Sequence, residues 1–526
     1  MHDKDNLIIT GFMGTGKTAV GREVAQRLGR EFIDMDALIE AREGMKAAEI
    51  FRQRGEAYFR CLEAALCREL ATRSGLVIAT GGGALIPETN RELLSASGVV
   101  ICLTASPDDI LSRLEGTEER PLLNVPNPRG RIAMLFAERS KAYQHIPLHV
   151  DTTGLNVAQV ADRVMAMAGT LPKTAITVCY PGGEYSVHLG RGLLAQSGAL
   201  LRQSGLDSKV ALVTNHTVAK RYAASVSESL EAAGFAVSPC VVPDGEAYKT
   251  LDTVRMLYDD FIVAGLDRHS IVLALGGGVI GDLAGFAAAT YLRGVALVQL
   301  PTTLLAMVDA SVGGKVGVDH PRGKNLIGAF KQPKLVIADV DTLSTLPAAE
   351  FASGLAEVVK AGIIGDPLLF TQIKEHGPSP LLWLIKRALQ VKVAIVQEDP
   401  YEHTRRAVLN LGHTFGHALE LLNNYTLPHG EAVSIGLVAD VRLSVRLGQC
   451  EPALAVRVEE TLARLGLPTT YRGHTPQQIR EAMATDKKRH GRTIRFVLIR
   501  DIGDVFVTDQ VPETDVLDVL ASLGTA

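Results

Sequence analysis

The sequence predicts an α/β protein built from more than one domain, with a mainly helical C-terminal part. At 526 residues the chain is long enough for about three domains. One glycine-rich loop follows a short apolar segment at residue 11, and another follows an apolar segment at residue 276. Histidines gather near residue 420 at a helical spacing. Apolar strands that run into glycine loops and then helices are typical of parallel α/β sheets.

Composition indicates a globular protein without a nucleic-acid or membrane partner. Apolar residues make up 47% of the chain and charged residues 21%, and the net charge is −4 with a pI near 6.4. No stretch approaches the roughly 20 apolar residues of a membrane span. The six cysteines include no C-x-x-C pair, which is typical of reduced thiols. We therefore expect a soluble, cytoplasmic protein that binds small molecules.

The first glycine loop matches the phosphate-binding pattern G-x-x-x-x-G-K-[ST]. Residues 7–10 read as a buried strand, residues 11–18 are Gly-Phe-Met-Gly-Thr-Gly-Lys-Thr, and a helix is expected over residues 19–28. Backbone N–H groups in such a loop converge on a phosphate, and the helix N-terminus adds its dipole. Lys17 would reach the β- and γ-phosphates of a nucleoside triphosphate, and the Thr18 hydroxyl would ligate Mg²⁺. The predicted nucleotide contacts are Gly14, Thr15, Gly16, Lys17 and Thr18.

Charged residues after this loop predict the phosphoryl acceptor. Asp34 and Asp36 follow an apolar run, and a strand ending there would place both carboxylates on one side. One carboxylate would support Mg²⁺ and the other would receive the acceptor's hydroxyl. Arg120 begins a stretch rich in proline and glycine that suits a closing lid. With Arg60 and Arg139, these residues indicate a small, anionic, hydroxylated acceptor.

The regular alternation of strands and helices fades after residue 165. We expect a first domain over residues 1–168, a linker over 169–174, an α/β subdomain over 175–345 and a mainly helical subdomain over 346–526. No internal repeat relates these parts, so the chain is interpreted as a fusion of two unrelated enzymes.

The second α/β part has only half of a dinucleotide-binding fingerprint. A predicted strand over residues 270–275 runs into Gly-Gly-Gly-Val-Ile-Gly-Asp, which formally satisfies G-x-G-x-x-G. The acidic residue expected about 20 positions downstream is missing. The segment 244–249, Asp-Gly-Glu-Ala-Tyr-Lys, could serve the ribose or the pyrophosphate instead.

The histidine cluster predicts a divalent metal site. His413 and His417 are four residues apart, so in a helix both imidazoles would share one face. His429 follows after a turn, and neutral imidazole is the commonest metal ligand in proteins. Glu357 and Lys360 share another predicted helix face, and Glu357 is an oxygen ligand candidate.

Residues 1 to about 165 resemble shikimate kinase. The resemblance rests on the phosphate loop, Asp34-x-Asp36, Arg60-x-x-Glu63, the triple glycine at 81–83, Arg-Pro-Leu-Leu from residue 120 and Arg139-x-x-x-Tyr143. It implies a P-loop kinase fold, a parallel sheet with helices on both faces. It also implies that Asp36 orients the attacking hydroxyl of shikimate and that Arg120 covers the phosphates of ATP. The implied shikimate contacts are Asp36, Arg60, Gly82 and Arg139. A gluconate-type or nucleoside kinase is the alternative for this part.

Residues from about 175 to the C-terminus resemble 3-dehydroquinate synthase. The motifs are Asp-Gly-Glu-Ala-x-Lys, the second glycine loop, Pro-Thr-Thr-Leu from 301, Gly-Gly-Lys to 315, Ala-Glu-Val-Val-Lys to 360, Asn-x-Gly-His-Thr-x-Gly-His from 410, Leu-Pro-His-Gly-Glu from 427 and Asp-Lys-Lys from 486. The resemblance implies a Rossmann-like NAD-binding subdomain and a helical metal-binding subdomain.

The same resemblance implies the ligands of each site. Zn²⁺, or Co²⁺ in its place, would be held by Glu357, His413 and His429, which leaves His417 for the substrate or a proton. The implied substrate contacts are Arg293, Lys315, Asn325, Lys360, Lys392, Arg406, Asn410, His417 and Lys487. The implied NAD⁺ contacts are Glu246, Ala247, Tyr248, Lys249, Gly277, Gly278, Val279, Ile280, Asp282, Thr302, Thr303, Asp309 and Lys324. The implied catalytic residues are Lys17 and Asp36 in the first part, and Lys315, Lys360 and His417 in the second.

Together the two resemblances imply a bifunctional shikimate-pathway enzyme. One part would phosphorylate shikimate with ATP and Mg²⁺, and the other would convert 3-deoxy-D-arabino-heptulosonate 7-phosphate to 3-dehydroquinate plus phosphate. A homodimer through the synthase part is also expected. The alternatives are a gluconate-type kinase fused to a metal-dependent NAD polyol dehydrogenase, or a non-enzymatic module. The lysines and arginines of the second part argue against a neutral polyol as substrate.

Overall fold

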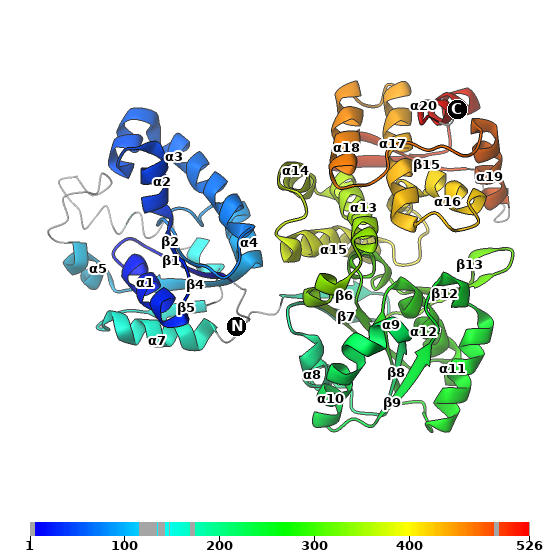
Figure 1. Ribbon diagram of the computed structural model, residues 1–526, viewed down its shortest axis with the longest axis horizontal. Helices are drawn as coiled ribbons and strands as arrows, with labels where there is room; N and C mark the ends of the chain where they lie inside the picture. Colours follow the sequence, from blue (N-terminus) through cyan, green and yellow to red (C-terminus); the bar gives the residue numbers. More distant parts are fainter. Residues whose placement is uncertain are drawn as a thin grey trace. The chain divides into compact units, whose positions relative to one another are not determined.

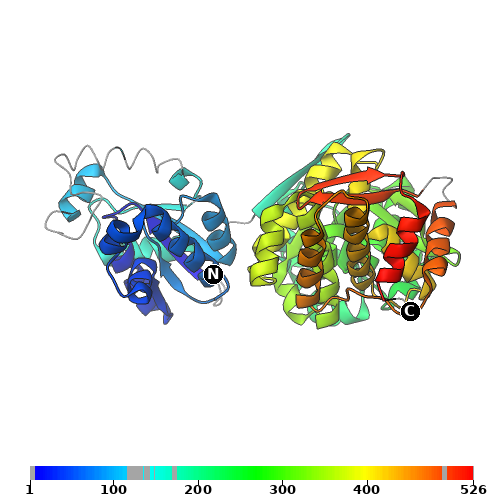
Figure 2. The same cartoon turned by 90° about the horizontal axis from the view of Figure 1, so that it is seen from above.

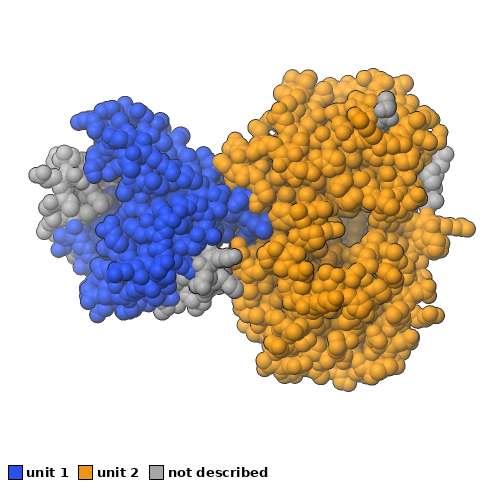
Figure 3. Space-filling model, viewed as in Figure 1, with its two compact units in different colours: residues 1–172, 379–383 blue, residues 173–378, 384–526 orange. Residues whose placement is uncertain are grey.

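The computed structural model describes residues 6–114, 134, 142–146, 148–168, 174–488 and 494–524. The chain divides into two units, one formed mainly by residues 1–172 and the other by most of the remainder (Figure 3). None of the helices in the described residues combines the length and the apolar character that spanning a bilayer requires.

The first unit contains a five-stranded parallel sheet with the strand order β2-β3-β1-β4-β5. Val20 and Val24 of α1 and Val160 and Val164 of α7 share a core cluster with alternate residues of the sheet, so these two helices cover one face. The strands are β1 (Asn6–Gly11), β2 (Phe32–Asp34), β3 (Val77–Ala79), β4 (Gly98–Thr104) and β5 (Leu148–Asp151), and the helices are α1 (Lys17–Leu28), α2 (Met35–Glu43), α3 (Ala47–Ala71), α4 (Glu88–Ser97), α5 (Pro107–Leu114) and α7 (Val157–Ala168).

The central strand β1 ends where a side chain has no room. Gly11 pairs with Leu103 of β4, and a Cβ at Gly11 would lie 2.2 Å from the Leu103 carbonyl oxygen. Gly16 then precedes α1 with a φ of 89°, a left-handed conformation that favours glycine. These two glycines let the chain turn from the strand into the helix and place the phosphate loop at the carboxyl edge of the sheet.

The second unit begins with a seven-stranded sheet of order β6-β7-β14-β11-β10-β8-β9. Only the pair β6–β7 is antiparallel among the described strands of this sheet. Its strands are β6 (Thr174–Tyr180), β7 (Gly183–Gly190), β8 (Val210–Asn215), β9 (Val237–Val242), β10 (Ile271–Gly276), β11 (Ala296–Pro301) and β14 (Leu335–Asp339).

Helices cover both faces of this sheet because its strands are apolar on both sides. Along β8, Val210 and Leu212 pack with α8 and α10, whereas Ala211 and Val213 pack with α11 and α12. The Rossmann-like architecture is thereby confirmed. The helices of this half are α8 (Ser197–Gln203), α9 (His216–Val218), α10 (Ala224–Ala232), α11 (Leu251–Val263) and α12 (Gly278–Thr290), and an antiparallel hairpin of β12 (Lys315–His320) and β13 (Gly323–Phe330) packs on α12.

The C-terminal half is mainly helical, as expected. Helix α17 is buried along most of its length and packs against α13, α16 and α18, with α17 and α18 side by side in both views (Figure 1, Figure 2). The elements are α13 (Ala348–Gly365), α14 (Pro367–His376), α15 (Leu381–Glu398), α16 (His413–Leu422), α17 (His429–Arg446), α18 (Pro452–Arg464), α19 (Pro476–Lys488), α20 (Glu513–Ser522) and the antiparallel pair β15 (Phe496–Asp501) and β16 (Asp504–Thr508).

Candidate active sites

In the first unit, the phosphate loop joins β1 to α1, and its side chains are held by nearby groups. Lys17 Nζ donates to the carbonyl oxygen of Phe12 at 3.0 Å, and the Thr18 hydroxyl donates to Asp34 Oδ2 at 2.6 Å. Arg113 of α5 donates to the backbone oxygen of Thr152 at 2.8 Å and lies 3.5 Å from the carbonyl oxygen of Gly14. Sequence reasoning missed Arg113, because no motif marks a side chain that reaches the loop from a distant helix.

The expected placement of the two aspartates on one strand end is wrong. Strand β2 ends at Asp34, whose carboxylate accepts a hydrogen bond from the Ala37 N–H and caps α2. Asp36 therefore lies in the first turn of that helix rather than on the strand. A capping carboxylate stabilises a helix start, and this local preference overrode the period-2 pattern.

Asp36, Arg60 and Glu63 surround the triple glycine. Arg60 pairs with the buried Glu63 at 2.6 Å. A Cβ at Gly81 would lie 2.5 Å from Asp36 Oδ1, and a Cβ at Gly83 would lie 2.1 Å from an Arg60 nitrogen. These glycines thus allow the charged groups to approach the backbone. The Tyr143 hydroxyl donates to the carbonyl oxygen of Gly82 at 2.6 Å, and both Arg120 and Arg139 lie outside the described residues.

In the second unit, three residues from three helices converge as a candidate metal-binding group. Glu357 comes from α13, and His413 and His429 are the first residues of α16 and α17. The Nε2 atoms of His413 and His429 lie 3.7 and 3.6 Å from the same oxygen, Glu357 Oε1. That oxygen is buried and accepts no hydrogen bond from any described residue. Ligands bonded to Zn²⁺ at about 2.0–2.1 Å in a tetrahedron lie about 3.4 Å apart, so the three groups fit a divalent ion.

The other ring nitrogens hold both imidazoles in orientation. His413 Nδ1 lies 3.1 Å from the Leu411 carbonyl oxygen, and His429 Nδ1 lies 3.4 Å from both oxygens of Glu420. Burial lowers the pKa of His413 well below its usual value. Burial also lowers the pKa of His429, but Glu357 and Glu420 outweigh it and raise that pKa to about 9. A metal ion binds the neutral imidazole, so it would compete with a proton at His429.

His417 lies beside this group without belonging to it. Its ring centroid is 5.1 Å from that of His413 and 6.4 Å from that of His429. The three grouped ligand atoms come from Glu357, His413 and His429. Spacing within α16 pairs His413 with His417, whereas the fold brings His413 to residues of two other helices.

A cavity of about 990 Å³ extends from these histidines to the glycine loop of β10 and α12. Lys360 contacts Glu357, Lys392 contacts Asp309, and Lys315 Nζ lies 2.5 Å from Glu402. Burial lowers the pKa of Lys392, while Asp309 opposes that shift. The lining also contains the buried Arg406, with Asn325, Asn410 and His417.

At the other end of the cavity, Lys249 Nζ lies 3.0 Å from Asp282 and 3.6 Å from Glu246. A Cβ at Gly277 would lie only 3.0 Å from the Thr303 methyl carbon, so a side chain at this position would crowd Thr303. Burial raises the pKa of Asp282 to about 6, although Lys249 opposes the shift. The predicted nucleotide contacts that line this end are Glu246, Lys249, Gly277, Gly278, Val279, Ile280, Asp282, Thr302, Thr303, Asp309 and Lys324.

Three predicted contacts lie elsewhere. Ala247, Tyr248 and Arg293 are exposed and do not belong to the described lining of the cavity. The side chain of Lys487 is outside the described part of α19. Glu420 lines the cavity and contacts His429, and sequence reasoning assigned it no role. Its position seven residues after His413 on one helix face was the available signal.

Family models match separate parts of the chain. A shikimate kinase family model matches residues 13–168, and the N-terminal and C-terminal models of 3-dehydroquinate synthase match residues 239–353 and 354–489. The 3-dehydroquinate synthase of Citrifermentans bemidjiense is 48% identical over 336 residues, covering 62% of this chain and 93% of the relative. That of a Synechococcus strain is 46% identical over 362 residues, covering 66% and 98%.

A solved structure shares the fold of the second unit. The 2-epi-5-epi-valiolone synthase ValA from Streptomyces hygroscopicus, with NAD⁺ and Zn²⁺ bound, is 30% identical with a TM-score of 0.62 and covers 66% of this chain and 98% of its own. The chain therefore belongs to the 3-dehydroquinate synthase family and carries a shikimate kinase domain ahead of the synthase, so that it joins two shikimate-pathway enzymes in one polypeptide.

Proposed function

We propose that the first unit phosphorylates shikimate with ATP and Mg²⁺, and that the second converts 3-deoxy-D-arabino-heptulosonate 7-phosphate to 3-dehydroquinate and phosphate. The observation that carries the second activity is the group of Glu357, His413 and His429 at one end of a cavity lined by lysines and an arginine. A metal ligand set and a glycine loop in one cavity suit a reaction that uses both a metal and a dinucleotide.

Glu357, His413 and His429 would hold Zn²⁺, with Co²⁺ as the less available substitute. The glycine loop after β10 and the N-terminus of α12 would hold NAD⁺. When bound, the metal polarises a hydroxyl group and the nicotinamide accepts and returns a hydride. Related proteins support both assignments, since ValA has NAD⁺ and Zn²⁺ bound and a 2-deoxy-scyllo-inosose synthase, 25% identical with a TM-score of 0.59, is complexed with NAD⁺ and Co²⁺.

The cations of the cavity would bind the two anionic groups of the substrate. Lys315, Lys360, Lys392 and Arg406 each lie against a carboxylate or a backbone oxygen of the protein. A phosphate or carboxylate that enters takes up the remaining donors of these groups, which are already oriented by their partners. His417 stands next to the metal ligands and is assigned to substrate contact or proton transfer.

In the kinase unit, separate side chains are assigned to shikimate, to the transferred phosphate and to Mg²⁺. Asp36 would orient the attacking hydroxyl of shikimate, and Arg60 would bind its carboxylate while Glu63 holds the guanidinium. Lys17 would contact the transferred phosphate, and Thr18 would ligate Mg²⁺. The assignments of Arg120 as lid residue and Arg139 as shikimate ligand remain predictions.

A homodimer through the synthase unit and a cytoplasmic location complete the proposal. Leu292 and Arg293 have positive φ values of 48° and 67° on an exposed turn. Arg293 is exposed and outside the described lining of its own cavity, so we infer that it contacts the substrate bound by a second copy of the chain. If so, mixing Arg293→Ala protein with Glu357→Gln protein should restore synthase activity, and no recovery would contradict the shared site.

The free cysteines fit a reducing compartment.

Both activities can be tested in one chain with matched variants. Phosphate release from 3-deoxy-D-arabino-heptulosonate 7-phosphate should require NAD⁺ and stop with a chelator, and ADP should form from ATP plus shikimate. Glu357→Gln should abolish only the synthase activity and Lys17→Met only the kinase activity, so each variant controls for the other. Net NADH accumulation would instead support the polyol dehydrogenase, which the comparisons do not favour, and ADP formation with gluconate alone would refute the kinase assignment.

A further inference from the structure

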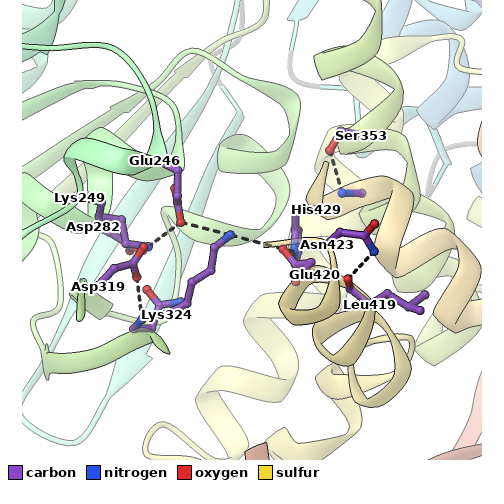
Figure 4. A network of polar contacts seen from close by, with 12 residues as sticks. Glu246, Lys249, Asp282, Asp319, Lys324, Ser353, Leu419, Glu420, Asn423 and His429 are labelled. Atoms are coloured by element: carbon purple, nitrogen blue, oxygen red, sulfur yellow. Dashed lines mark hydrogen bonds and ion pairs between the residues drawn. The ribbon is translucent and has the colours of Figure 1, made fainter. Parts of the chain in front are cut away.

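One ammonium group bridges the two halves of the synthase unit. Lys324 lies on β13, which belongs to the nucleotide half, and its Nζ is 3.4 Å from Glu246 in the same half. The same Nζ is 3.4 Å from Glu420 of α16 in the helical half (Figure 4). It also lies over the ring of Tyr425, 4.8 Å from the ring centroid. Lys324 is therefore shared between the cavity's nucleotide end and its metal end.

Glu420 extends this bridge to a metal ligand. Its side chain is 3% exposed, and both of its carboxylate oxygens lie 3.4 Å from His429 Nδ1. The opposite ring nitrogen of His429 is 3.6 Å from Glu357. Figure 4 shows Lys324, Glu420 and His429 in succession. A carboxylate that accepts from the second nitrogen of a metal-binding histidine sets its tautomer and ring orientation, and losing such a partner typically lowers metal affinity 10- to 100-fold.

We propose that Glu420 is the positioning residue for His429 and that Lys324 couples it to the nucleotide site. This inference rests on the proposed function, in which the two ends bind NAD⁺ and a divalent metal. Glu246 and Glu420 come from different halves, and Lys324 contacts both only when the hairpin β12–β13 and helix α16 lie at their present separation. A dinucleotide bound against the hairpin side of the cavity would favour that separation, and so would a metal held by His413 and His429, the first residues of α16 and α17.

The two ligands should therefore bind cooperatively. NAD⁺ should raise the affinity for the metal, and by linkage the metal should raise the affinity for NAD⁺ by the same factor. A coupling of about 1–2 kcal/mol corresponds to a factor of roughly 5 to 30. Removing the Lys324 ammonium should remove the coupling between NAD⁺ and metal binding. Removing the Glu420 carboxylate should weaken metal binding itself.

The test uses the full-length chain and needs no turnover. Zn²⁺ affinity is measured by competition with a chromophoric chelator, with and without NAD⁺, and Co²⁺ is used for its visible absorption spectrum. Glu420→Gln should lower the Zn²⁺ affinity about 10- to 100-fold and alter the Co²⁺ spectrum. Lys324 is itself a predicted NAD⁺ contact, so the comparison is made at NAD⁺ concentrations that saturate each variant. Lys324→Met should then keep most of the Zn²⁺ affinity but bring the ratio with and without NAD⁺ close to one.

Two further variants distinguish a bridge from a general loss of structure. Lys324→Arg keeps the charge and should restore the coupling, and Lys334→Met makes the same change at an exposed lysine of this half and should behave like wild type. Wild-type Zn²⁺ affinity in Glu420→Gln, or undiminished coupling in Lys324→Met, would overturn the inference. If the coupling is found but no 3-dehydroquinate forms from the heptulosonate phosphate, the proposed function fails and the coupling stands.

Discussion

Replacing Gly430 with alanine tests how the metal ligands are brought together. Helices α13 and α17 meet where the Gly430 N–H donates to Ser353 Oγ at 2.9 Å. A Cβ at Gly430 would lie 2.2 Å from the Ser353 carbonyl oxygen and 2.4 Å from its Cα. Ordinary contacts between such atoms are about 3.5 Å, so the helices must separate by about 1 Å. His429 directly precedes Gly430, and Glu357 lies one turn beyond Ser353.

The expected loss follows from that displacement. Metal–ligand distances tolerate only about 0.2 Å, and the ligand atoms Glu357 Oε1 and His429 Nε2 are 3.6 Å apart before the change. Overpacking costs about 1–3 kcal/mol, and if that cost falls on the metal-bound arrangement the affinity drops on the order of 10- to 100-fold. Ser353→Ala should not rescue Gly430→Ala, because the nearest atoms belong to the backbone.

The assay is Zn²⁺ competition with a chelator, followed by the metal content of the protein after gel filtration. Gly365→Ala is the matched control, since it lies at the exposed end of the same helix α13 and its Cβ would meet Val391 at an ordinary 3.4 Å. That variant should bind Zn²⁺ like wild type. Wild-type Zn²⁺ affinity in Gly430→Ala would refute the argument that this helix contact sets the ligand geometry.

Three other predictions concern single side chains. His417→Ala should lose turnover yet retain most of the zinc found by elemental analysis, and apoprotein would show that His417 is a ligand. Burial raises the pKa of Asp440 well above its usual value, and Asp440 accepts the Gly412 N–H at 2.6 Å. Between the ordinary and the folded pKa, Asp440 carries a proton in the folded state but not in the unfolded state. The free energy of unfolding is therefore highest at low pH and falls by up to about 1.4 kcal/mol per pH unit as pH rises toward the folded pKa. Asp440→Asn should abolish this slope in chemical unfolding measured at increasing pH above the ordinary aspartate pKa, and an unchanged slope would assign it to other groups. Gly81→Ala should reduce kcat/KM for shikimate by more than tenfold, because its Cβ would lie 2.5 Å from Asp36 Oδ1, while synthase rates in the same preparation stay unchanged.

The phosphate loop was predictable from sequence because it is local. Residues 11–18 specify a strand, a turn and a helix within a few positions, and the structure has β1 end at Gly11 and α1 begin at Lys17. The two α/β sheets and the helical C-terminal half were likewise confirmed, since strand and helix periodicities are properties of neighbouring residues. The exception was Asp36, where the helix cap at Asp34 overrode the strand pattern.

The metal-binding group depends on tertiary structure. Spacing along the chain pairs His413 with His417, because only residues of one helix can be compared that way. The family resemblance of the motifs, and not their spacing, implied Glu357, His413 and His429. Glu357 and His429 reach His413 through the packing of α13, α16 and α17, in which Gly430 lets two helices approach closely. The sequence alone determined which side chains were available and which local elements carry them. The fold decided which of them meet, because contacts between distant residues depend on how the helices pack.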